Sequence, residues 1–444
     1  FQLSFAAVGA LIVLVPILRQ RIPDVLYRYR LSKAATDLVL TSVVATLGTA
    51  PVMLYHFGQL PLAGLVLNVI AIPATATALF GGLGTGLLGY HVPFLADAFA
   101  AVCELGTSVM MFAGEQGAQS LDWTVIRMFV REPLVVLALV SGLLVLAFWI
   151  RPRVRWRFVA LTILLISLGA WTSTIRNEHQ PRLDVLFLDV GQGDATLVTL
   201  PNGKTMLIDA GLRNAYTDHG TRTILPHLRR FGIDRLDAVV LTHADADHFG
   251  GALSVMEHID VGRLIHSGHQ KDNALWQRTL AVADSLGVPQ RTVMAGDVLD
   301  LDASVRVRVL HPTGIPQSWE DGNDASVVLR LEYNNTSFLF TGDVEASGES
   351  SLVSTYGSLL ASTVVKVAHH GSSTSSTEPF VDEAADSTTE FAVVSVAKRN
   401  RYGLPNEEPL ARWITAGVDV LETAQEGAVW LQSNGTRVER VNWR

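Results

Sequence analysis

Two patterns of hydrophobic residues divide the chain near residue 175. Before this point, apolar runs of about 20 residues occur at about 1–18, 37–57, 61–90, 94–113, 133–150 and 157–175. A helix of roughly that length spans a bilayer, and exposed backbone polar groups are not tolerated in lipid, so the runs predict transmembrane helices. A large helical core in a soluble protein is the alternative, and several runs that carry no charge argue against it.

After a short polar linker at 176–182, the pattern changes to short strands rich in β-branched and aromatic residues. Strands are predicted at 185–190, 195–200, 205–211, 236–242, 305–312, 326–333, 337–343, 364–370 and 391–397. Helices are predicted at 220–233, 250–258 and 273–286. Strands with helices between them indicate α/β layers. We therefore expect a helical membrane domain at 1–175 and an α/β domain at 183–444.

Charge follows the same division. Residues 1–175 hold 11 basic and 7 acidic residues, whereas the remainder holds 23 basic and 35 acidic residues, a net charge of −12. The single cysteine, Cys103, excludes a disulfide framework and a thiolate zinc site. The chain begins without Met inside an apolar run, so we expect an internal fragment with a truncated first helix; a signal peptide is the alternative.

Two basic segments predict the orientation in the membrane. The first contains Arg19, Arg21, Arg28, Arg30 and Lys33, and the second contains Arg151, Arg153, Arg155 and Arg157. Basic loops stay in the cytoplasm. If 61–90 crosses once, four spans separate the two segments, which places both on one side and the chain after Ile175 outside the cytoplasm.

Two features of the membrane half have open interpretations. Asp97 and Glu104 lie within 94–113, where they would line a polar pathway or belong to a shallow amphipathic helix. Pro73 and a glycine-rich stretch interrupt 61–90, which predicts either a broken helix beside a pore or a kink that faces lipid.

The sequence LTHADADHFGG at 241–251 concentrates metal-binding side chains at the end of a buried strand. Its polar residues are His243, Asp245, Asp247 and His248. Imidazole and carboxylate groups are ligands for divalent metals, and the two following glycines allow close approach of the backbone. A polar loop with a helix cap is the alternative.

Other strand ends present similar chemistry. Asp343 ends FLFTGD, His369 and His370 end VVKVAHH, and Asn323 precedes the strand in NDASVVL. Separate solvated loops do not explain why several buried strands finish in such residues. We expect one metal site, assembled from strand ends along one edge of a sheet.

These motifs resemble the metallo-β-lactamase fold, an αββα sandwich that binds two metals. FLDVGQGDATLV, HADADHFGGA, TGDVE, HHGSSTSS and NRYGLP, after a polytopic region with FQLSFAAVGA, are similar to the ComEC family of DNA-uptake competence proteins. The resemblance covers nearly the whole chain. It implies a channel for single-stranded DNA and an extracytoplasmic nuclease domain.

The resemblance also implies a ligand set. His243, Asp245 and Asn323 would hold one metal; Asp247, His248 and one of His369 and His370 would hold the other. Asp343 would bridge the metals, and Asp209 would orient the loop. Asp245 and Asn323 stand where the family usually has histidines, which makes the first site harder and favours Mn²⁺ or Mg²⁺ over Zn²⁺.

Two metals can activate a water and hold both oxygens of an in-line displacement, which suits phosphodiester hydrolysis. We expect Asp247 and His369 to be catalytic and His370 to bind metal. Weaker candidates for substrate contact are Ser372, Ser375, Lys398 and Tyr402. The expected partners are single-stranded DNA, the lipid bilayer of the cell membrane and other proteins of DNA uptake.

The negative charge of the α/β domain is unusual for a protein that binds nucleic acid. A local basic patch from Arg222, Arg229, Arg230, Lys398, Arg399 and Arg401 would compensate, and a scattered set of solvated charges is the alternative. Two other functions stay open. They are hydrolysis of another phosphoester, such as a lipid headgroup, and DNA binding without cleavage.

Overall fold

The structure is a computed structural model that describes residues 1–127, 133–147, 152–177, 181–269, 271–314, 319 and 322–442. The chain divides into two compact units, Phe1–His179 and Gln180–Arg444. The boundary lies within the polar linker predicted at 176–182. Each unit is described by itself.

The first unit is helical. Its helices are α1 (Gln2–Arg19), α2 (Arg30–His56), α3 (Gly64–Leu88), α4 (Pro93–Ser120), α5 (Pro133–Ala147) and α6 (Pro152–Asn177), and strands β1 (Gln59–Pro61) and β2 (Val125–Arg127) pair antiparallel. Among the described residues, α1 to α4 are long and apolar enough to cross a membrane. These four helices cover most of the runs predicted at 1–18, 37–57, 61–90 and 94–113, with α3 shorter than its run.

The remaining two predicted spans fall partly outside the described residues. Helix α5 has 15 described residues and α6 contains the run at 157–175, but 148–151 and the side chains of 170–177 are not described. The crossing of the membrane by these two segments stays a prediction. Arg151 of the second basic segment also lies outside the described residues.

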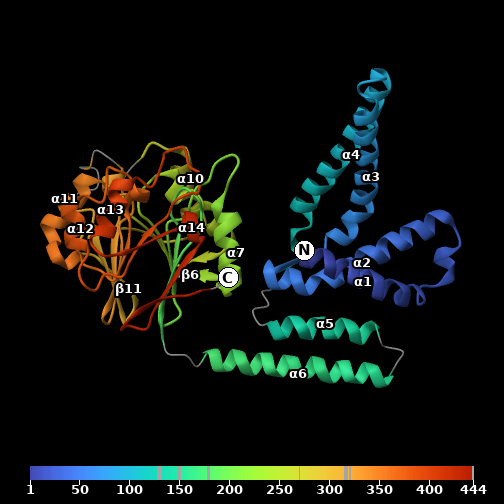
Figure 1. The fold of residues 1–444 in the computed structure, drawn as a ribbon, viewed down its shortest axis with the longest axis horizontal. Helices are drawn as coiled ribbons and strands as arrows, with labels where there is room; N and C mark the ends of the chain where they lie inside the picture. The colour runs from blue at the N-terminus through green and yellow to red at the C-terminus, as the bar shows by residue number, and fades with distance from the viewer. Residues whose placement is uncertain are drawn as a thin grey trace. The chain divides into compact units, whose positions relative to one another are not determined.

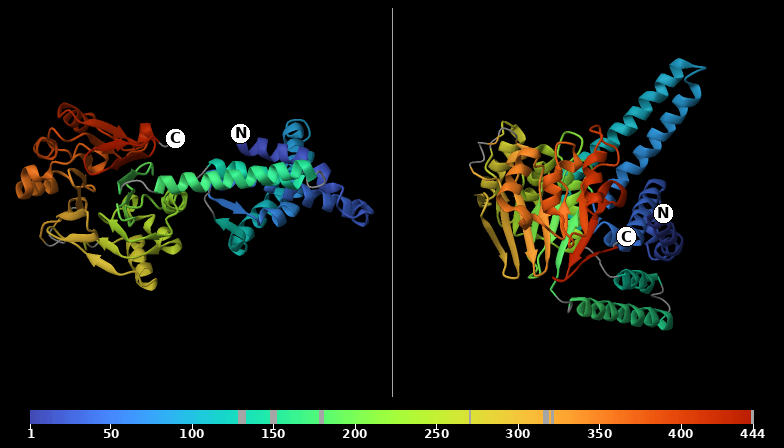
Figure 2. Two further views of the ribbon diagram at one scale, coloured as in Figure 1. Left: turned by 90° about the horizontal axis from the view of Figure 1, so that it is seen from below. Right: turned by 60° about the vertical axis from the view of Figure 1, so that its left-hand side comes forward.

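Helix α3 is continuous and includes Pro73, and its glycines allow it to pack closely against α4. The predicted break in this helix is therefore wrong. A Cβ atom on Gly81 would lie 2.4 Å from the backbone nitrogen of Cys103, and one on Gly106 would lie 2.6 Å from that of Ala78. Only glycine permits this approach of α3 and α4, which run side by side in Figure 2.

Most apolar side chains of helices α1 to α4 are at least partly exposed. The share of buried residues within each apolar segment of α1 to α4 ranges from 6% to 28%. Soluble proteins rarely expose apolar surface so extensively, whereas lipid solvates it. Asp97 and Glu104 are also exposed on α4, and the alternatives for them stay open.

The second unit contains two large sheets, flanked by helices on both sides in Figure 1. The first sheet has the order β10 (Gln290–Thr292), β9 (Leu264–His266), β7 (Ala238–Leu241), β5 (Thr205–Ile208), β4 (Thr196–Thr199), β3 (Leu183–Phe187), β18 (Val429–Ser433) and β19 (Val438–Arg440). The second has the order β11 (Val298–Asp302), β12 (Val305–His311), β13 (Val328–Tyr333), β14 (Thr336–Phe340), β15 (Val364–Lys366), β16 (Phe391–Val394) and β17 (Asp419–Glu422).

Both sheets follow one plan. Strands β3, β4 and β5 form an antiparallel meander, after which β5, β7, β9 and β10 run parallel. Strands β11 to β14 likewise form a meander that continues as parallel strands β14 to β17. The carboxyl ends of β5, β7, β14 and β15 therefore reach the same edge of the sandwich.

Three apolar cores hold this unit together. One lies between the sheets, where Phe187 and Phe340 rings meet at 6.0 Å. A second lies between the first sheet and α7 (Leu225–Phe231), α8 (Ala246–Phe249), α9 (Ala252–His258) and α10 (Ala274–Ser285). The third lies between the second sheet and α11 (Ala346–Tyr356), α12 (Glu378–Ala384) and α13 (Glu407–Thr415). These layers confirm the predicted αββα sandwich.

Candidate metal centre

Residues that follow strands of both sheets meet at one edge of the sandwich. Asp209 follows β5 and His243 follows β7, whereas Asp343 follows β14 and His370 follows β15. All four side chains are buried. The parallel arrangement of these strands brings residues that are far apart in sequence into one cluster.

His248, on the short helix α8, is the most enclosed of these residues. Its side chain has no exposed surface. Nδ1 lies 2.9 Å from Asp209 Oδ2, and Nε2 lies 3.0 Å from Asp343 Oδ2. Burial lowers the pKa of His248, but the carboxylates of Asp343 and Asp209 outweigh burial and raise it well above its ordinary value. Asp209 therefore orients the imidazole, as predicted for a partner behind a ligand.

His370 approaches the same carboxylate from the second sheet. Its Nδ1 donates to Ser395 O at 2.8 Å, and its Nε2 lies 3.3 Å from Asp343 Oδ2 and 3.7 Å from Asp247 Oδ2. Burial lowers the pKa of His370, but the nearby carboxylates of Asp343 and Asp194 raise it to about 9. The hydrogen bond to Ser395 turns Nε2 towards the cluster.

The backbone that carries His370 is strained. His369 has φ 48° and His370 has φ 54°, in the left-handed region that side chains with a Cβ rarely adopt. Such conformations cost of order 1–3 kcal/mol each and persist where the surrounding structure imposes them. The strain accompanies the placement of two consecutive imidazoles in different directions.

Asp343 and Asp247 supply carboxylate oxygens to the cluster. Burial raises the pKa of Asp343, but His248, His370 and Lys366 hold it well below its usual range. Burial raises the pKa of Asp247, but its hydrogen bond with His370 and the charge of His248 outweigh burial and lower this pKa below its usual range. Both side chains therefore remain ionised and available to a cation.

Asp194 and Lys366 form a buried ion pair that the sequence did not indicate as part of the site. The Lys366 ammonium contacts Asp194 Oδ2, and also donates to Gly342 O at 2.9 Å and to Asp343 Oδ1 at 3.3 Å. The two paired side chains are 4% and 6% exposed. Lys366 thus holds one oxygen of Asp343 and leaves Oδ2 facing the two imidazoles.

His243 lies beside His248, with ring centroids 4.2 Å apart. Burial and the charge of His248 lower the pKa of His243 to about 4, although nearby carboxylates oppose this shift. Its Nδ1 lies 3.1 Å from Thr242 Oγ1, whereas its buried Nε2 has no hydrogen-bond partner among the described residues. A neutral imidazole with a free nitrogen is suited to metal binding.

The other two residues predicted for the first metal have protein partners. Asp245 forms an ion pair with Lys271, and its side chain is one third exposed. Asn323 Nδ2 lies 3.4 Å from Glu345 Oε1. We call the partly exposed region formed by the pairs Asp245–Lys271 and Asn323–Glu345 the rim of the cluster. The role of Asp245 and Asn323 as metal ligands stays a prediction.

His369 pairs with Glu345 and is not one of the four residues of the buried cluster. Nδ1 lies 3.0 Å from Glu345 Oε1 and 3.1 Å from Thr374 Oγ1. Its side chain is 24% exposed. Of the two consecutive histidines, His370 faces the buried cluster and His369 lies at the accessible rim.

The weaker substrate candidates occupy different environments. Ser375 is fully buried, and its hydroxyl donates to Ala368 O at 2.9 Å, so we reassign it from substrate contact to the structure of the turn. Ser372 Oγ lies 3.0 Å from Thr374 Oγ1. Lys398 is exposed, and the hydroxyl of Tyr402 accepts from Arg401 at 2.7 Å. The structure does not join these four residues into one surface.

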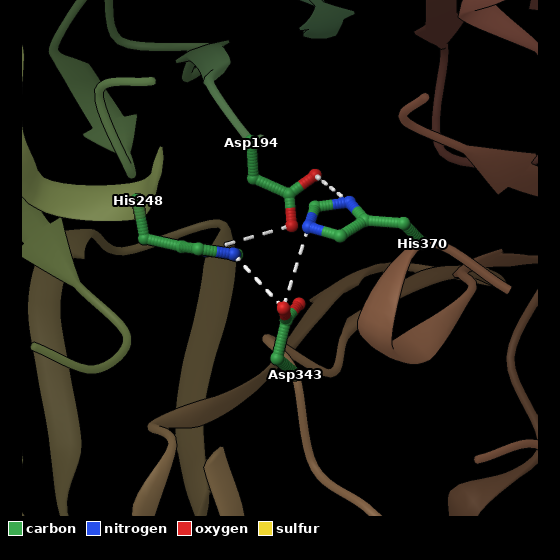
Figure 3. Close-up of side chains that lie close together, drawn as sticks. All are labelled: Asp194, His248, Asp343 and His370. Atoms are coloured by element: carbon green, nitrogen blue, oxygen red, sulfur yellow. Dashed lines mark hydrogen bonds and ion pairs between the residues drawn. The ribbon is translucent and has the colours of Figure 1, made fainter. Parts of the chain in front are cut away.

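Four buried side chains, Asp194, His248, Asp343 and His370, each offer one atom within a common distance of 4.8 Å (Figure 3). Within the described part of the chain, the buried Nε2 atom of His243 lacks a hydrogen-bond partner, and that of His370 faces two carboxylates, with Asp343 Oδ2 at 3.3 Å and Asp247 Oδ2 at 3.7 Å. Buried polar atoms are normally satisfied. Imidazole nitrogens that face one another and ionised carboxylates in this way fit a divalent metal ion.

Comparison with known proteins divides the chain at the same place as the fold. Residues 1–153 match the Competence protein family, and residues 188–390 match the Metallo-beta-lactamase superfamily. The chain thus joins a competence protein domain to a metallo-β-lactamase domain, which confirms the resemblance inferred from the motifs.

Two curated relatives are similar to this chain along most of its length. The chain is 28% identical over 447 residues to ComE operon protein 3 of Bacillus subtilis (strain 168), covering 97% of the chain and 54% of that protein. It is 30% identical over 392 residues to Competence protein ComA of Neisseria gonorrhoeae, covering 87% of the chain and 50% of that protein. The chain spans about half the length of these relatives.

Solved structures are more distant. CmlA, a diiron beta-hydroxylase from Streptomyces venezuelae, is 15% identical with a TM-score of 0.36, covering 65% of this chain and 59% of that chain. A likeness of this size carries no information about the reaction.

Proposed function

We propose that this chain acts in DNA uptake, as a membrane protein whose second unit hydrolyses one DNA strand with divalent metal ions. The metallo-β-lactamase fold supports a metal-dependent hydrolase, and the competence domain supports the choice of DNA. The observation that carries the proposal is the buried group of carboxylates and imidazoles around Asp343, in which His370 Nε2 faces carboxylates and His243 Nε2 has no partner among the described residues.

The side chains divide the work. His248, His370, Asp343 and Asp247 would hold one ion, and His243 with Asp245 and Asn323 would hold a second. When bound, a pair of divalent ions supplies Lewis acidity and an activated water for phosphodiester hydrolysis. Asp209 orients His248, and Lys366 holds Asp343 so that one oxygen faces the imidazoles. The oxygen-rich donor set of the second position favours Mn²⁺.

His369 is the candidate proton donor at the rim. Glu345 and Thr374 engage its Nδ1, so Nε2 is the nitrogen that is available to the leaving oxygen of a substrate. A positioned general acid contributes typically about 10²–10⁴-fold to a rate. His369→Ala should therefore lower the rate of cleavage while leaving metal binding unchanged.

The membrane unit is proposed to pass a single strand inward. The two basic segments, at 19–33 and 151–157, should both lie in the cytoplasm. One further predicted span follows the second segment, so the second unit would lie outside the cell membrane. Labelling of a Ser373→Cys variant in a Cys103→Ala background by a membrane-impermeant maleimide checks this orientation. Labelling of intact cells is expected, and labelling only after lysis would contradict it.

The nuclease proposal is tested with the purified full chain in detergent and a labelled single-stranded oligonucleotide. We expect cleavage that requires Mn²⁺ and is lost in Asp247→Ala, whereas Asp234→Ala, an exposed acid remote from the cluster, retains it. Cleavage of a lipid headgroup analogue but not of DNA would select the other phosphoesterase. DNA binding without cleavage under any divalent ion would select a binding module.

A further inference from the structure

A groove of about 580 Å³ lies on the outer face of strands β12 and β13 of the second sheet. Along β12, Val305, Val307 and Val309 point into the core between the sheets, so the alternation of the strand directs Arg306 and Arg308 outward. The groove is also lined by Val298, Arg330, Glu332, Tyr356 and Leu359. Helix α11 ends at Tyr356 and leaves this part of the sheet open to solvent.

The groove is positively charged in an otherwise acidic unit. Three guanidinium groups face one carboxylate, that of Glu332, which pairs with both Arg308 and Arg330. Arg330 also donates to Ala361 O at 2.9 Å and is held in place. Arg306 forms no ion pair with any residue that the structure describes, so its charge is available to a ligand.

Apolar side chains flank these charges. Leu359 is 68% exposed and Val298 is 49% exposed, and the half-buried ring of Tyr356 lies in the same groove. A single nucleic-acid strand carries phosphates for arginines and unstacked bases for aromatic and apolar surfaces. A duplex shields its bases in the stack, so the combination fits a single strand.

Strand β12 connects the groove to the region of the metal centre through the interior of the fold. Strand β12 runs from the arginines through Leu310, which lines the groove, to His311, whose Nε2 donates to Asp324 O at 2.7 Å. Asp324 Oδ1 accepts from the backbone nitrogen of Glu345 at 2.8 Å, and Glu345 holds His369. His311 and Asp324 are buried, so these contacts connect the two regions through the fold and are not a surface path.

We propose that the groove around Arg306 and Arg308 binds single-stranded DNA. The proposal rests on the proposed function for the identity of the polyanion, but binding at this surface does not require cleavage. It also explains how a unit with net negative charge takes an anionic strand. The basic residues predicted around Lys398 are the competing surface.

Binding is measured as the fluorescence anisotropy of a labelled single-stranded oligonucleotide with the full chain in detergent and EDTA. We expect Arg306→Glu with Arg308→Glu to weaken binding at least about tenfold. Each lost phosphate contact lowers the salt dependence of affinity by about 0.7 for a single strand, so two contacts lower it by about 1.4. Arg437→Glu with Arg440→Glu changes the total charge equally at exposed positions of the first sheet and should bind within about twofold of the wild type.

A second assay separates DNA binding at the groove from phosphodiester cleavage at the metal centre. With Mn²⁺ and bis(p-nitrophenyl) phosphate, a substrate too small to need the groove, the groove variant should match the wild type. If no phosphodiester is cleaved by either protein but only the groove variant loses DNA binding, the groove stands and the nuclease proposal fails. Unchanged affinity and salt dependence in the groove variant would overturn the groove, whatever the cleavage result.

Loss of binding in Lys398→Glu with Arg399→Glu, with full binding in the groove variant, would also overturn it. Arg306→Gln with Arg308→Gln removes the charges without reversing them. This milder variant should show an intermediate loss with an unchanged melting temperature, and full binding in it would count against the proposal.

Discussion

The two halves of the candidate metal centre differ in the burial of their side chains and in how firmly protein partners orient them. On the buried half, His248 and His370 are almost inaccessible, and each has its Nδ1 fixed by Asp209 or by the carbonyl of Ser395. On the open half, His243 is buried, but Asp245 is paired with Lys271 and Asn323 with Glu345 at the rim.

For the proposed pair of metal ions, this difference predicts positions of unequal affinity. Orienting partners behind the ligands preorganise the buried half before any ion binds. An ion at the open half must instead displace Lys271 from Asp245. We therefore expect one tight and one weak site.

The largest effect is expected from Lys366→Met in the unit of residues 180–444. It leaves the Asp194 carboxylate buried without its cation, and breaking a buried pair in this way costs about 3–5 kcal/mol. The free energy of unfolding, from urea denaturation, measures the loss. Lys204→Met, at an exposed position, is the matched control, and equal stability of the two variants would show that the buried pair is not needed.

The turn that carries His370 should make stability depend on pH. Buried Glu349 accepts from the backbone nitrogens of Ser376 at 2.5 Å and Thr377 at 2.8 Å, and burial raises its pKa from 4.5 to about 7. The folded state therefore keeps this proton to higher pH than the unfolded state. The free energy of unfolding should fall by about 3 kcal/mol as pH rises from about 4.5 to 7.

Urea denaturation of Glu349→Gln across this range checks the assignment. The variant should lose the Glu349 contribution to the pH dependence, whereas Glu378→Gln, an exposed acid on α12, should keep it. A wild-type slope that survives in Glu349→Gln would exclude Glu349 as its source.

The sequence identifies nine strands of the sandwich and most of the centre because both leave local patterns, whereas it did not predict β9, β10, β11, β17, β18 and β19. Buried strands read as short apolar runs, and ligands such as His248 and Asp343 follow them directly. The role of Asp194 was missed because it lies in the segment GQGD at 191–194, whereas the other candidates were found next to predicted strand ends with clustered His and Asp residues. Lys366 was missed because one lysine in an apolar strand does not reveal that two carboxylates surround it.

Contacts between segments that are not adjacent in sequence explain the other differences between the predicted and the observed structure. Strand β18 joins β3 from the far end of the chain, and nothing near residue 430 indicates that partner. The glycines of α3 suggested a broken helix, but they permit close packing of α4, which depends on a neighbour rather than on local sequence. The separate environments of His369 and His370 arise from two left-handed residues that only the fold imposes.

A smaller effect is expected from Asp209→Asn. The new amide would face His248 Nδ1 and the Thr242 hydroxyl with a donor in place of an acceptor. Loss of such an orienting partner typically weakens metal binding about 10–100-fold. Calorimetric titration with Mn²⁺ should show this loss at the tight site only, with Asp234→Asn unchanged; a loss confined to the weak site would reverse the assignment of the two halves.

The smallest effect is expected from Lys271→Met on the open half. Partly exposed ion pairs contribute about 0–1 kcal/mol, so removing the competing ammonium should strengthen the weak site by up to about fivefold. The tight site should not change. Weaker binding in this variant would mean that Lys271 supports the metal position rather than competes for it.

The most direct test of the centre is the stoichiometry of Mn²⁺ binding to the full chain, followed by electron paramagnetic resonance of free Mn²⁺. The account predicts two ions of unequal affinity, with the tight one lost in His370→Ala and the weak one lost in His243→Ala. Wild-type binding no greater than that of a His248→Ala variant, for Mn²⁺, Zn²⁺ and Mg²⁺ alike, would contradict it.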